Sequence, residues 1–76
     1  MKIYVQAKSK ADINRRLASG ETFTGTNYSM FGGGGEYELN SDLPDGTVVA
    51  VYEKMVNGNP YAKSWGTWNA SKNKLS

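Results

Sequence analysis

The sequence predicts an α+β fold in which one short N-terminal helix packs on a mainly antiparallel, strongly curved sheet of four to five strands. Apolar and polar residues alternate near the N-terminus, a helical spacing of apolar residues follows, and the rest of the chain is rich in strand-forming and turn-forming residues. The expected order of elements is β-α-β-β-β-β. Because the chain has only 76 residues, we expect a single small domain over residues 1–76.

The first expected strand covers residues 2–8. Ile3, Val5 and Ala7 occupy every second position there, and the positions between them are polar or aromatic. This period places the three apolar side chains on one face of a strand and leaves the other face to solvent. The fold is therefore expected to begin with a half-buried strand.

A helix is expected over residues 10–18. Ser9 is a favourable residue for the position before a helix, and Gly20 is typical of the position after one. Ile13 and Leu17 are four positions apart, so they share one helical face. A helix this short is not stable by itself, so its apolar face must pack on the rest of the fold.

The segment that follows predicts extended structure interrupted by loops. Residues 21–31 contain strand-forming side chains broken by Gly25 and Asn27, which indicates one bent strand or two short ones. Residues 36–39 alternate and predict another strand. The glycine run at residues 32–35 is interpreted as a hairpin loop, because neither the lysine nor the helix of a phosphate-binding loop follows it.

The longest apolar run predicts a central strand over residues 47–55, covered on both faces for part of its length. Asn57 and Gly58 then form the residue pair that most strongly indicates a two-residue hairpin loop. With this loop, Ala50 lies opposite Trp65 in the next strand.

The two-residue loop also avoids an unfavourable pairing. A longer loop would place Lys54 opposite Lys63, and like charges in directly opposed positions are destabilising. Residues 69–73 predict a further turn. Residues 74–75 are expected either to add a short edge strand or to fray.

The charge of the chain is modest but unevenly distributed. The net charge is +2, yet residues 21–53 contain acidic residues and no lysine or arginine. One interpretation is a dipolar surface that contacts a polyanion on its basic side. The other is that the basic ends lie beside the acidic middle and neutralise it.

The absence of histidine and cysteine excludes most catalytic chemistry. It removes a histidine general base, a thiolate nucleophile and a cysteine–histidine zinc site. Glu36 and Glu38 share one face of a predicted strand and form the one carboxylate pair considered for hydrolysis or cation binding. Their simpler interpretation is the solvent face of a half-buried strand. We therefore expect no enzyme, no cofactor and no metal site.

The positive feature of the sequence is its aromatic content, with two Trp, five Tyr and two Phe. One small core is not expected to hold them all, so some should form a recognition surface. The predicted hairpin register places several of them on one face together with a lysine. The candidate binding residues are Tyr52, Tyr61, Lys63, Trp65, Trp68, Arg15 and Arg16.

Three interpretations of this aromatic face stay open. It forms core, or an interface with another protein, for which Tyr and Trp are favoured anchors. Alternatively it binds single-stranded nucleic acid, with bases stacked on the rings and phosphates held by Lys8, Lys10, Arg15, Arg16 and Lys63.

The short, cysteine-free chain starts at Met1, is rich in Gly, Asn, Ser and Tyr, and contains Trp65-Gly66-Thr67-Trp68-Asn69 near its end. In this general character it resembles small accessory proteins encoded by bacteriophages or prophages. That resemblance implies a binder that blocks or redirects a host factor, or that handles nucleic acid. The expected partner is a host protein or a second copy of the chain. Without an apolar leader or span, we expect a cytoplasmic protein that does not bind membranes.

Overall fold

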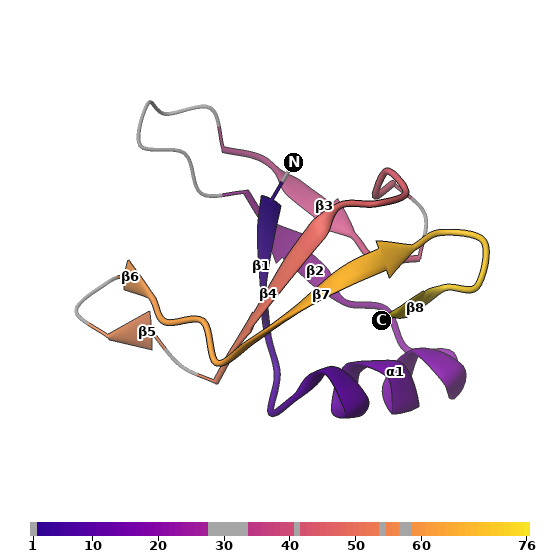
Figure 1. Cartoon of the computed structure of the whole chain (residues 1–76), viewed down its shortest axis with the longest axis horizontal. Helices are drawn as coiled ribbons and strands as arrows, with labels where there is room; N and C mark the ends of the chain where they lie inside the picture. Colours follow the sequence, from indigo (N-terminus) through magenta and orange to yellow (C-terminus); the bar gives the residue numbers. More distant parts are fainter. Residues whose placement is uncertain (1, 28–33, 41, 54, 57–58) are drawn as a thin grey trace.

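The computed structural model describes residues 2–27, 34–40, 42–53, 55–56 and 59–76, and places most of them in a curled sheet with one helix (Figure 1). The sheet strands are β1 (Lys2–Gln6), β2 (Thr24–Thr26), β3 (Glu36–Glu38), β4 (Val48–Tyr52), β7 (Ser64–Asn69) and β8 (Lys74–Leu75). The helix is α1 (Lys10–Ala18), and a separate hairpin consists of β5 (Met55–Val56) and β6 (Asn59–Pro60). The predicted α+β class is confirmed.

The sheet differs from the prediction in its number of strands and in one pairing. It has six strands in the order β3-β2-β1-β4-β7-β8, and β1 pairs with β4 in parallel. The other neighbouring pairs are antiparallel. Parallel strands require a long crossover, which here contains α1 and the β2–β3 hairpin. Alternation along a strand shows which side chains face the core but not which strand lies beside it, so the parallel pairing was not predictable from the pattern.

Helix α1 begins and ends where the sequence predicts. The Ser9 hydroxyl accepts a hydrogen bond from the Asp12 backbone N–H at 3.1 Å. After the helix, Gly20 adopts a φ of 93°, which residues with a side chain rarely adopt. This turn lets the Glu21 N–H donate to the Arg16 carbonyl at 3.0 Å, as in a common helix C-terminal motif.

The core lies between one face of the sheet and the elements that cover it. Helix α1 contributes Ile13 and Leu17 and packs on β7 and β8, while the connecting segments contribute Phe23, Leu39 and Leu43. The sheet side chains in the core are Ile3, Val5, Val49, Val51, Trp68 and Leu75. The expected inward direction of the apolar positions in the first strand and in the helix is confirmed.

The predicted hairpin register is confirmed. The pairs between β4 and β7 are Val48–Thr67, Val49–Gly66, Ala50–Trp65 and Val51–Ser64. Farther along, Val56 lies opposite Asn59, as a two-residue loop requires. The loop residues Asn57 and Gly58, and Lys54, lie outside the described residues. The central position of β4 is also confirmed, because Val49, Ala50 and Val51 are completely buried.

The last strand is an edge strand closed from outside by a side chain of the helix. Asn14 donates from Nδ2 to the Leu75 carbonyl at 2.9 Å, and its Oδ1 accepts from the Leu75 N–H at 2.8 Å. On the inner side, Thr67 and Ser76 exchange backbone hydrogen bonds of 3.2 and 3.0 Å. Asn14 therefore takes the place of a neighbouring strand, and residues 74–75 form a strand rather than fraying.

Replacing Asn14 with leucine is expected to reduce the free energy of unfolding by about 1–2 kcal/mol, because two partly buried hydrogen bonds are lost together. The Leu75 amide should also exchange its hydrogen faster. Hydrogen exchange followed by NMR measures this directly. An Ala11→Leu variant, which adds leucine at an exposed position of the same helix, is the control. Unchanged protection of Leu75 in Asn14→Leu would contradict the assigned role.

In the described part of the chain, no helix has the length and apolar character required to cross a lipid bilayer.

Candidate functional site

One face of the sheet is turned away from α1 and forms the candidate binding surface. We call it the open face and define it by Lys2, Tyr4, Val48, Ala50 and Trp65. Side chains alternate along each strand, so these residues point opposite to the neighbouring core positions. Tyr4 pairs with Ala50, and Ala50 pairs with Trp65, so the three residues form one row across β1, β4 and β7.

The centre of the open face is an aromatic pair with a cation. The rings of Tyr4 and Trp65 meet edge to face with centroids 6.4 Å apart. The Lys2 ammonium lies 4.4 Å from the Trp65 ring centroid and 5.8 Å from that of Tyr4. Ala50 lies in the row between the two rings and is completely buried. The contacts hold Trp65 in place while 45% of its surface stays exposed.

Exposed apolar surface continues on both sides of this centre. Val48 is 40% exposed, and Tyr61, which follows β6, is 69% exposed. Tyr52 is half-buried at the end of β4. Three predicted site residues, Tyr52, Tyr61 and Trp65, are thus accessible to different degrees.

The lysine predicted to accompany the aromatic residues is not the one that contacts Trp65. Lys63 donates from Nζ to Glu53 Oε2 at 3.2 Å, and both side chains are more than half exposed. Lys2 supplies the cation instead. The alternation of the first strand already placed Lys2 and Tyr4 on the outer face, but only the parallel pairing of β1 with β4 brings them beside Trp65.

Trp68 does not belong to the open face, which corrects its place among the candidate binding residues. It is only 2% exposed and lies in the core, opposite Leu75 of β8. Trp68 is two positions from Gly66, which pairs with the buried Val49. The predicted register contained this signal, because residues two positions apart in a strand share a face.

Arg15 and Arg16 lie on α1, and each is paired with a carboxylate. Arg15 binds Asp12, and Arg16 binds both oxygens of Glu21 at 3.0 and 3.1 Å. The Arg16 guanidinium also lies 4.4 Å from the Phe23 ring centroid. The structure therefore separates these arginines from the aromatic face that they were predicted to accompany.

The ion pairs of α1 predict a loss of stability in acid. Hydrogen bonds from Arg16 hold the pKa of Glu21 below its usual value, and Arg15 does the same for the pKa of Asp12. A lowered pKa in the folded state stabilises the fold at high pH, and this contribution is lost as the pH falls below about 4. An NMR titration should show the Glu21 midpoint rising in Arg16→Gln. An unchanged midpoint would contradict the pairing.

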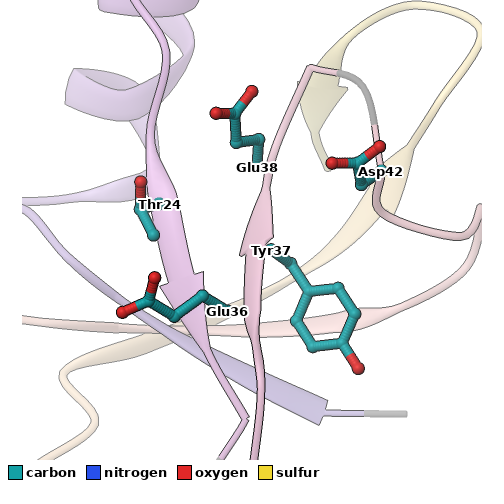
Figure 2. Close-up of a pocket in the computed structure, with 5 residues that line it drawn as sticks. All are labelled: Thr24, Glu36, Tyr37, Glu38 and Asp42. Atoms are coloured by element: carbon teal, nitrogen blue, oxygen red, sulfur yellow. The ribbon is translucent and has the colours of Figure 1, made fainter.

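An acidic pocket of about 210 Å³ lies along β3 (Figure 2). Its lining residues are Thr24, Glu36, Tyr37, Glu38 and Asp42. Figure 2 shows Tyr37 pointing away from β3 on the side opposite Glu36 and Glu38, so the pocket extends around the edge of the sheet. Glu36 and Glu38 are exposed, in agreement with the solvent-face interpretation. Within the described residues, no group of three or more Asp and Glu side chains is arranged to hold a metal ion.

Comparison with protein-family models, curated proteins and solved structures found no match. The functional assignment therefore depends on the surfaces of the molecule.

Proposed function

We propose that this protein is a non-enzymatic binding protein whose open face docks on another protein. The observation that supports this proposal most strongly is Trp65, nearly half exposed and held in place by Tyr4 and Lys2. Tryptophan is among the side chains that contribute most to protein interfaces, especially at the centre of a contact. A side chain that is already fixed loses little conformational freedom on binding.

The distribution of charge favours a protein partner over nucleic acid. A nucleic-acid platform needs cations beside its stacking rings. Among the described residues, Lys2 is the cation in contact with Trp65, whereas Arg15, Arg16 and Lys63 are paired with carboxylates. Glu36 and Glu38 also share the outward direction of the open face, at the β3 side of the sheet.

The resemblance to small phage-encoded proteins adds a biological context to the proposal. In that context the partner is a cytoplasmic host protein that is blocked or redirected by the bound chain. A second copy of the chain is the other partner to be tested.

Affinity capture from the cells in which the protein occurs tests the proposal, with and without nuclease. The wild type should retain a specific protein in both conditions, and Trp65→Ala should lose it. Arg15→Ala, altered on the opposite side of the sheet, is the matched control and should retain it. Circular dichroism must show that all three chains are folded, and sedimentation of the purified protein shows whether it associates with itself.

The alternative has a distinct result. If nuclease removes the captured material and Arg15→Ala weakens the capture, the protein binds nucleic acid. Binding to an oligonucleotide should then fall steeply as salt increases. Equal capture by the wild type and Trp65→Ala would exclude the open face as the docking surface.

A further inference from the structure

The two edges of the six-stranded sheet are treated differently. At the β8 edge, Asn14 bonds both outward backbone groups of Leu75. At the β3 edge, no described residue makes a hydrogen bond to the backbone of Glu36. An edge strand with unpaired backbone groups is a template for pairing with another chain, and natural proteins usually protect it.

Hydrogen bonds at the two ends of the β2–β3 ladder show which backbone groups of β3 point outward. Asn27 donates to the Gly35 carbonyl at 2.8 Å, and Leu39 donates to the Phe23 carbonyl at 3.0 Å. In an antiparallel pair, bonded and non-bonded residue pairs alternate. Glu36, opposite Thr26, therefore directs its N–H and carbonyl away from β2.

The same alternation applies to Glu38, opposite Thr24. Its carbonyl accepts a long hydrogen bond of 3.4 Å from the Asp42 N–H. The outward backbone groups along β3 are therefore at most weakly engaged within the described chain, with those of Glu36 the most accessible.

The side chains at this edge determine which strand it accepts. Glu36, Glu38 and Asp42 are exposed carboxylates, and residues 21–53 contain no lysine or arginine. A second copy of β3 would set glutamates against glutamates, which is unfavourable between paired strands. A strand with a basic residue at every second position would instead bring opposite charges together.

The pocket around β3 offers space for one such basic side chain. It is lined on one side by Tyr37 and on the other by Glu36 and Glu38. The aliphatic part of a lysine or arginine packs well on an aromatic ring while its charged end reaches a carboxylate. The pocket thus adds a place for a side chain to an edge that offers backbone hydrogen bonds.

We infer that the β3 edge binds an extended segment of a partner protein that carries lysine or arginine at alternate positions, by addition of a strand to the sheet. This recognition mode takes affinity from backbone hydrogen bonds and specificity from alternate side chains. It does not depend on the proposed function of the open face, because the open face uses Trp65 and the edge uses the backbone of β3.

The test uses a synthetic, end-capped peptide of sequence TKTKTKT and the full chain labelled for NMR. We expect amide shifts concentrated at Glu36 and Glu38 and slower hydrogen exchange at Glu36. A peptide methylated on the backbone nitrogens that face β3 keeps its charge but loses its donors, and it should bind at least about tenfold more weakly. Equal binding by the methylated peptide would overturn the inference in favour of simple charge attraction.

Two variants complete the test. The double variant Glu36→Gln, Glu38→Gln should weaken binding of the unmodified peptide by about fivefold to tenfold, because two cross-strand charge pairs are lost. Glu53→Gln, which removes a carboxylate elsewhere, should leave the affinity unchanged. Trp65→Ala should also bind the peptide normally, which separates this surface from the open face. Shifts confined to α1 or β8 would contradict the assigned edge.

Discussion

Replacing Trp68 with alanine is expected to remove most of the stability of this chain. The indole is 2% exposed and packs among the core residues between the sheet and α1. Truncation of a buried tryptophan costs about 3–5 kcal/mol, whereas a domain of this size has roughly 4–11 kcal/mol in total. Urea unfolding followed by circular dichroism measures the difference.

Trp65→Ala is the matched comparison, because it removes the same side chain from the opposite face of the same strand. Its cost should be about 1 kcal/mol, from the lost contacts with Tyr4 and Lys2. Two tryptophans of equal weight in unfolding experiments would contradict the division into a core residue and an open-face residue. The same pair of variants therefore distinguishes the core interpretation of the aromatic residues from the interface interpretation.

Replacing Gly25 with valine is expected to destabilise the fold by about 3 kcal/mol, at the upper end of the usual cost of overpacking a core. A Cβ atom at Gly25 would lie 2.5 Å from Cδ1 of Ile3 and 3.2 Å from Cγ2 of Val5. Both neighbours are buried in β1, so they have little room to move. Glycine is required here because β2 presses closely against the apolar side chains of the adjacent strand.

Two further variants isolate this steric cause. Thr24→Val adds valine to an exposed position of β2, where a β-branched residue is favourable, so it should change stability little. Ile3→Ala removes as many carbon atoms as Gly25→Val adds. The double variant should be more stable than the sum of the single changes predicts, by about 0.5–3 kcal/mol. Simple additivity would show that the two side chains do not compete for the same space.

Local signals in the sequence were sufficient for the helix and for one hairpin. Ser9, Gly20 and the spacing of Ile13 and Leu17 determine the bounds of α1, because capping and periodicity act within a few residues. The register of β4 and β7 followed from the loop pair and from charge repulsion, which are also local. These signals specify neighbours in the chain and say little about strands that meet from distant segments.

The site was predicted less completely for the same reason. Tyr61 and Trp65 are exposed, as a recognition surface requires, but Trp68 belongs to the core. Lys2 and Tyr4 were not among the candidates, because only the parallel pairing of β1 and β4 brings them beside Trp65. The size of the core was also underestimated as a place for aromatic residues, since it holds Phe23 and Trp68 with Tyr37 packed against it.

The uneven charge of the sequence has a structural explanation in the described residues. Arg16 from the basic N-terminal segment pairs with Glu21, and Lys63 from the basic C-terminal segment pairs with Glu53. Both pairs join a basic segment to the acidic middle, as the neutralisation interpretation predicts. The β3 edge keeps its acidic character because its carboxylates lie in the stretch without lysine or arginine.

The parallel pair at the centre of the sheet also determines when the protein is able to fold during its synthesis. β1 leaves the ribosome first, but its neighbour β4 follows only after the helix and the β2–β3 hairpin have been translated. Until then Ile3 and Val5 lack the strand that completes their half of the core. Closing such a long loop is slow compared with forming local contacts. We therefore expect a nascent chain that ends before Val48 to stay unfolded, and cooperative structure to appear only after β4 has emerged.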